Sequence, residues 1–130
     1  MTKENWRQSW LESIHELTSF KLQKNSSANV ANDNIYWLFD KMVNNYIDKV
    51  LFGFDYQFYT EEMNYLSREE FEIIKEWHNE LEDYILLIGD DSEETVIVRD
   101  KIMISFLHNG KLAKQQLIAI LPDAEKHYLK

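Results

Sequence analysis

The sequence contains no cysteine, a single proline and only three glycines among its 130 residues. Without cysteine the chain can form neither a disulfide framework nor a thiolate zinc site, and an oxidising compartment gains no support. Tight turns between strands depend on glycine and proline, so their scarcity disfavours an all-β fold. These absences favour a helical protein.

Long apolar runs are also missing. No run approaches the ~20 residues that a membrane span requires. The N-terminal segment MTKENWRQSW lacks the continuous apolar core of a signal peptide. We therefore expect a cytoplasmic protein that has no membrane partner.

Apolar and aromatic residues are nevertheless abundant, at 45% and 14% of the chain, which argues against intrinsic disorder. A chain of this length is the size of one domain and can bury roughly two thirds of the surface that its unfolded form exposes. We predict a single all-α domain over residues 1–130, a bundle of about five to six helices.

The net charge is −9, and the acidity is concentrated in one stretch. Residues 55 to 94 hold 14 acidic and 2 basic residues, residues 1 to 54 balance at 6 and 6, and residues 95 to 130 carry a net charge of +3. Nucleic acid is not the expected partner, since binding to phosphates depends on Lys and Arg. The acidic stretch is either a solvated face or a docking surface for a basic partner.

The clearest helix signal extends from Ser67 to Ile88. Ser67 followed by Glu70 is a capping box, in which each side chain satisfies the other residue's backbone amide. Apolar residues then recur at spacings of three and four, which predicts one buried face. Five carboxylates fall on the opposite face at about 100° per residue: Glu69, Glu72, Glu76, Glu80 and Asp83.

Three further helices and a loop are predicted before this helix. A cap at Thr2 and apolar spacing over Trp6, Trp10, Ile14 and Leu17 predict a helix to about Leu22. The Ser- and Asn-rich residues 24–34 predict a loop. A second helix, capped by Asn32 or Asp33, should end near Leu51, before Gly53. A short helix over residues 55–64 is the favoured interpretation of the aromatic segment that follows.

After the 67–88 helix comes an acidic turn that includes Asp90, Asp91, Glu93 and Glu94. The last two should lie in a first helical turn, where the positive helix end favours acids. Residues 95–106 are β-branched enough to form a small hairpin, but the helical flanks favour a helix that ends at Gly110. A separate helix over 111–121 should then end at Pro122.

His78 lies in the apolar face of the 67–88 helix, four residues before Glu82. Such a pair can act as a general base or contribute to a metal site. The other histidines are scattered, however, and no calcium loop, phosphate loop or nucleophile motif occurs. We therefore interpret His78 as a buried, hydrogen-bonded core residue, and we expect no catalytic residue, metal or cofactor.

The segment LSREEFEIIKEWHNELEDYI, the acidic turn GDDSEE and the apolar segment VIVRDKIMISFL together resemble bacterial immunity proteins of the contact-dependent growth inhibition type. In that family of small acidic helical proteins, a Leu-Ser-x-Glu-Glu helix ends near a Trp-His or Phe-His pair, a Tyr and an acidic loop. The resemblance covers about residues 62 to 107. At residues 99–102 this chain has Arg-Asp-Lys-Ile where the family has Asp-Pro-x-Trp.

The resemblance implies a non-enzymatic cytoplasmic protein that binds and neutralises a toxin domain, for example a nuclease with a basic cleft. The docking surface would then comprise Glu69, Glu72, Glu76, Glu80, Asp83, Asp90, Asp91, Glu93 and Glu94. The protein would be a monomer or a weak homodimer. Two alternatives stay open: a helical regulatory subunit that dimerises through the aromatics around Phe52 to Tyr59, and a small metal- or carboxylate-dependent hydrolase that uses His78 and Glu82.

Overall fold

The computed structural model describes residues 2–19, 38–90 and 92–130. These residues form α1 (Lys3–Thr18), a helical segment over 38–45 that continues as η1 (Tyr46–Val50), η2 (Phe58–Glu62), α3 (Arg68–Ile85), α4 (Glu93–Ile120), α5 (Asp123–Lys126) and η3 (His127–Leu129). No strand occurs in the described ranges, so the predicted all-α bundle of five to six helices is confirmed there. The hairpin alternative at 95–106 is wrong, because this segment lies within α4.

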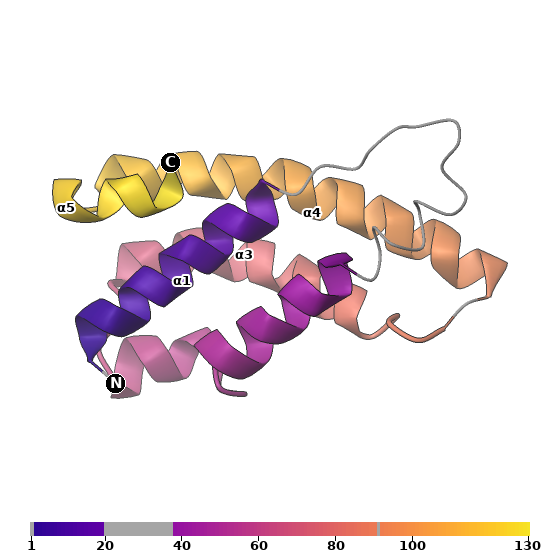
Figure 1. Cartoon of the computed structure of the whole chain (residues 1–130), viewed down its shortest axis with the longest axis horizontal. Helices are drawn as coiled ribbons and strands as arrows, with labels where there is room; N and C mark the ends of the chain where they lie inside the picture. The colour runs from indigo at the N-terminus through magenta and orange to yellow at the C-terminus, as the bar shows by residue number, and fades with distance from the viewer. Residues whose placement is uncertain (1, 20–37, 91) are drawn as a thin grey trace.

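The helices pack around one cluster of buried side chains. α3 lies mainly along α4, and α1 packs on α4, η1 and η3, as Figure 1 shows. The core is strongly aromatic, since Trp6 stacks on Trp10 and on Tyr59, and Trp77 stacks on Phe106. None of the helices that the structure describes is long and apolar enough to cross a membrane.

The first half of the chain follows the predicted order where it is described. The Thr2 side chain accepts a hydrogen bond from the Asn5 amide and caps α1. α1 ends at Thr18, with Ser19 as its C-cap, so the predicted end at about Leu22 is late. Residues 20–22, the 24–34 loop and the Asn32 or Asp33 cap lie outside the described residues. The second helix ends at Val50 with Leu51 as its C-cap, close to the predicted end, and a short helix follows within residues 55–64.

α3 begins as predicted but ends earlier. Ser67 and Glu70 form the complete capping box, with Glu70 Oε1 2.8 Å from the Ser67 amide. The helix ends at Ile85 rather than Ile88, because the Leu87 and Ile88 amides donate to carbonyls only three residues back and Gly89 adopts a φ of +93°. The predicted end was therefore three residues late.

α4 corrects the second boundary. It is one helix of 28 residues that passes through Gly110, so the predicted stop at this glycine is wrong. A Cβ atom built on Gly110 would lie 2.7 Å from both the Thr18 methyl group and the Trp77 indole nitrogen. Glycine is required here because α1, α3 and α4 approach one another closely. The helix ends at Ile120, just before Pro122.

Candidate functional site

The acidic face of α3 (Glu69, Glu72, Glu76, Glu80 and Asp83) forms as the helical spacing predicted. Four of its residues are exposed and Glu80 is half-buried. The opposite face of α3 supplies core residues including Ile74, Trp77 and Leu81. The carboxylates therefore project from an element that is rigidly packed on its other side.

Few basic groups neutralise this face. Arg68 approaches both Glu72, at 3.5 Å, and Glu61 of η2, at 3.9 Å, and all three side chains are largely exposed. Within the described ranges, Glu69, Glu76 and Asp83 make no ion pair. One arginine offsets only part of the charge of five carboxylates, so the face keeps its negative potential.

Glu80 differs from its four neighbours because it connects α3 to α4. Its carboxylate accepts a hydrogen bond from the Ser105 hydroxyl and another from the Asn109 side-chain amide, both at 2.6 Å. These bonds fix the carboxylate at the edge of a shallow groove between the two helices. Apolar side chains, including Ile73 and Leu112, line this groove beside Glu76.

The acidic residues of the turn differ in hydrogen bonding and in exposure. Asp90 is engaged in the turn itself, since its carboxylate accepts from the Ser92 amide and the Thr95 hydroxyl, both at 3.0 Å. These hydrogen bonds lower the pKa of Asp90. Glu93 and Glu94 are exposed in the first turn of α4, as predicted, and Asp91 lies outside the described residues.

His78 lies at the end of a buried chain of hydrogen bonds. The Trp10 indole N–H donates to the Tyr56 hydroxyl (3.0 Å), which bonds to the Tyr46 hydroxyl, and this hydroxyl lies 3.0 Å from His78 Nδ1. His78 Nε2 lies 3.2 Å from the Glu82 carboxylate. Because indole only donates and carboxylate only accepts, the chain runs in one direction and assigns the proton of the neutral ring to Nε2.

This environment stabilises the neutral form of His78. Burial lowers its pKa, and the opposing attraction of Glu82 and Asp55 does not restore it. Burial likewise raises the pKa of Tyr46 and of Tyr56. The site is therefore a set of uncharged, hydrogen-bonded groups within the core.

A cavity of about 220 Å³ opens beside His78, between α3 and the residues that precede η2, and Asp55, Lys75 and Glu82 contribute to its lining. Both ring nitrogens of His78 are already hydrogen-bonded, and the described residues that line the cavity include no Ser or Thr nucleophile. Among the described residues, no three His, Asp or Glu side chains converge to hold a metal ion. The prediction of a buried core histidine fits this geometry better than a catalytic base does.

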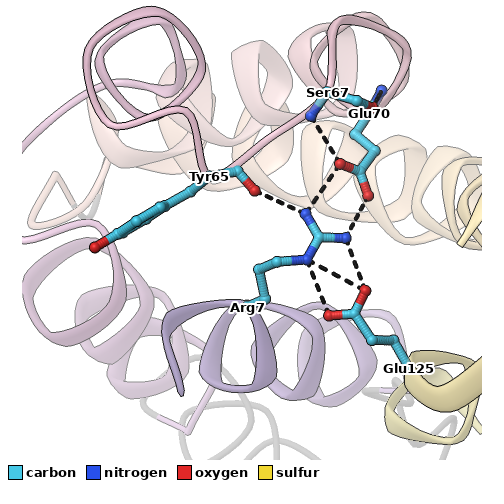
Figure 2. Close-up of polar contacts among 5 residues, drawn as sticks. All are labelled: Arg7, Tyr65, Ser67, Glu70 and Glu125. Carbon is cyan, nitrogen blue, oxygen red and sulfur yellow. Dashed lines mark hydrogen bonds and ion pairs between the residues drawn. The ribbon is translucent and has the colours of Figure 1, made fainter. Parts of the chain in front are cut away.

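A second polar cluster was not predicted and joins the two ends of the chain to α3 (Figure 2). Arg7 donates from Nη1 and Nη2 to the two Glu70 oxygens at 3.0 and 2.6 Å, and from Nε to Glu125 at 2.9 Å. It also donates to the Tyr65 carbonyl at 2.8 Å. Burial would raise the pKa of Glu70, but hydrogen bonds from Arg7 and Ser67 outweigh it, and the pKa lies below its ordinary value.

Arg7 has one signal in the sequence that could have identified it. It lies among the apolar positions of its helix, between Trp6 and Leu11, where a charged side chain requires a buried partner. Its partner Glu125 carries no such signal, because it lies 118 residues away. The cluster satisfies every charge in it, so we assign it a structural role.

Comparisons with protein-family models, with curated proteins and with solved structures find no match to this chain. The resemblance to bacterial immunity proteins therefore stays a prediction.

Proposed function

We propose that this chain is a binding protein without enzymatic activity, and that the acidic face of α3 docks onto a basic protein partner. The single observation that carries the proposal is the state of that face. Glu69, Glu76 and Asp83 are exposed without ion pairs among the described residues, on a helix whose other side is locked into the core. Fixed, uncompensated carboxylates are suited to steering and orienting a positively charged surface.

The partner class follows from the resemblance to immunity proteins. In this proposal the partner is a toxin domain with a basic cleft, which the acidic face blocks in the cytoplasm. Glu93 and Glu94 extend the negative surface at the start of α4. Asp90 contributes its charge, although its oxygens are engaged by Ser92 and Thr95.

A charge-reversal experiment tests the proposal. The resemblance to immunity proteins implies that a large toxin is encoded directly beside this gene, and the C-terminal domain of such a toxin is the partner to be used. The double variant Glu76→Lys, Asp83→Lys should associate at least about tenfold more slowly than the wild type, and its association rate should depend less on salt. Stopped-flow mixing over a series of salt concentrations measures both quantities.

The matched control is Glu12→Lys, Glu16→Lys on α1, which changes the net charge equally at two exposed positions away from α3. This control should slow association much less. Equal effects of the two pairs would mean that only net charge matters, and unchanged binding by the α3 pair would refute the docking surface.

The alternative with a specific observation behind it is a hydrolase that uses His78 and Glu82, which lie 3.2 Å apart beside a cavity. The geometry favours it less, because the Tyr46 hydroxyl occupies the other nitrogen of the ring. Loss of a hydrolytic activity in His78→Gln, with the fold retained, would revive this alternative.

A further inference from the structure

The turn between the second helix and η2 presents aromatic side chains to solvent. Phe52 and Phe54 are 54% and 52% exposed, and Phe54 stacks on the half-buried Phe58 with ring centroids 4.2 Å apart. We call Phe52, Phe54 and Phe58 the aromatic turn. It lies at the lower edge of Figure 1, where the magenta helix gives way to the pink one.

The backbone beneath these rings is firmly held by the core. The Val50 carbonyl accepts a hydrogen bond from the buried Trp6 indole at 2.8 Å. The Leu51 carbonyl accepts from the Tyr59 hydroxyl at 2.6 Å and from the Phe54 amide at 3.0 Å. The two exposed rings are therefore mounted on a rigid base, and a partner need not order the backbone on binding.

Phe52 is also held in an unfavourable backbone conformation. Its φ is +53°, and the next residue, Gly53, has a φ of +76°. Left-handed backbone is uncommon for a bulky residue, and strain of this kind concentrates at functional sites. Asn or Gly would fit this position with less strain, so folding alone does not account for phenylalanine here.

Acidic residues flank the aromatic turn along the chain. The segment 48–62 contains four exposed acidic residues, Asp48, Asp55, Glu61 and Glu62. Lys49 is the one basic residue in this segment of the sequence. Asp55 is fixed against the turn, because its carboxylate accepts from the Phe58 amide at 2.8 Å. Through the Arg68 contacts, Glu61 also connects this rim to the acidic face of α3.

We propose that the aromatic turn is the apolar anchor of the docking surface, and that it inserts into an apolar pocket bordered by Lys and Arg on the basic protein partner. Interfaces of this kind take most of their affinity from a few buried aromatic residues within a polar rim. The inference rests on the proposed function, and it adds which residues provide most of the binding affinity.

A second copy of the chain is a poorer occupant. Self-association through the aromatic turn would bring the same acidic rim against itself, and like charges in contact are unfavourable. Two half-exposed rings also provide a small part of the ~800 Å² per partner that a stable interface buries. A partner with a basic rim avoids this repulsion, and it can also bury the acidic face of α3 in addition to the two rings.

The three glycines of the chain provide resolved amide signals for a test by NMR. Gly53 lies in the aromatic turn, Gly89 lies beside the acidic turn that begins α4, and Gly110 is buried. The probe is a synthetic amphipathic peptide of Leu and Lys, and its control is the same peptide with Glu in place of Lys. The Lys peptide should shift the Gly53 amide and leave Gly110 in place, and the Glu peptide should shift neither.

The test variant is Phe52→Asn, Phe54→Ser, which should bind the Lys peptide at least about tenfold more weakly. Because Asn tolerates the left-handed conformation, this variant should retain its melting temperature, which separates lost binding from lost folding. Phe54→Ser alone serves if the double variant does not fold. The control is Leu86→Ser, which removes an 81% exposed apolar side chain elsewhere and should bind as the wild type does.

Each other outcome overturns the inference in a distinguishable way. A Lys peptide that shifts Gly89 but not Gly53 would leave the acidic face as a docking site without the aromatic anchor. Shifts at neither glycine would contradict both proposals. Equal binding of the Glu peptide would contradict the requirement for Lys and Arg on the partner. If sedimentation showed that the wild type is a dimer and the variant a monomer, the aromatic turn would instead bind a second copy of the chain.

Discussion

At the scale of single residues, His78 shows how a buried chain of hydrogen bonds selects a protonation state. With a neutral ring, each hydroxyl between Trp10 and His78 donates to the next acceptor. A second proton on Nδ1 would reverse the bonds of Tyr46 and Tyr56, and the Tyr56 hydroxyl would then lose its acceptor. This cost acts in the same direction as burial, which lowers the pKa of His78.

The first prediction concerns the pH dependence of stability. Because the folded-state pKa of His78 lies below the unfolded value of 6.5, the unfolded chain binds more protons between the two. The His78 contribution to the free energy of unfolding should therefore be complete above pH 6.5 and decrease as the pH falls from there to the folded-state pKa. Its slope is at most about 1.4 kcal/mol per pH unit, the value for uptake of one proton.

Urea unfolding from about pH 8 to about pH 5 measures this dependence. The control is His78→Gln, whose amide keeps a polar side chain but cannot take up the proton. The difference between wild type and variant should change with pH in this window alone. A constant difference would contradict the lowered folded-state pKa of His78.

At the scale of elements, the packing of α4 against α1 and α3 depends on a glycine, Gly110. The Trp77 indole donates to the Phe106 carbonyl at 3.1 Å, and Gly110 lies directly beside it against Thr18 of α1. Glycine inside a helix ordinarily costs about 1 kcal/mol relative to alanine. Here that cost is offset by packing, because glycine allows α1, α3 and α4 to approach closely at this position.

The second prediction is that Gly110→Ala destabilises the protein by about 1–3 kcal/mol, because its methyl group would overpack the crossing, although alanine is the better helix former. Thr18→Ser removes the methyl group that lies 2.7 Å away and keeps a hydroxyl that can donate to the Ile14 carbonyl. The double variant should therefore recover part of the loss. Thermal unfolding checks all three proteins, and an additive double variant would contradict the steric explanation.

The elements also show which structural features the sequence predicts. The capping box and apolar period of α3 are local, so its start, its buried face and its acidic face could all be predicted. The Gly110 crossing could not, because the reason for glycine lies on two other helices. Arg7 and Glu125 escaped prediction for the same reason, as did the Glu80 contacts with Ser105 and Asn109. Charge periodicity identified the candidate site but gave no sign of its aromatic neighbour.

At the scale of the whole molecule, the clustering of acidic residues lowers the stability of the folded state. Residues 55 to 94 carry 14 acids and 2 bases, and part of this charge lies on one face of α3. Mutual repulsion of fixed like charges destabilises a compact state, and salt screens it over ~10 Å at about 0.1 M. A face retained only for solubility could distribute its acids more evenly over the surface. The clustering is therefore a cost that the proposed docking function would explain.

The last prediction measures that cost. In low salt, Glu76→Gln, Asp83→Asn should raise the melting temperature by about 2 °C, because it removes two charges that have no ion pair among the described residues. The gain should disappear at about 0.5 M NaCl, where repulsion is screened. Glu12→Gln, Glu16→Gln makes the same chemical change on α1, in a region of balanced charge, and should gain much less. If both pairs raised the melting temperature equally, the repulsion would come from the net charge of the protein rather than from the α3 face. A partner that binds the α3 face would then not relieve a repulsion located there.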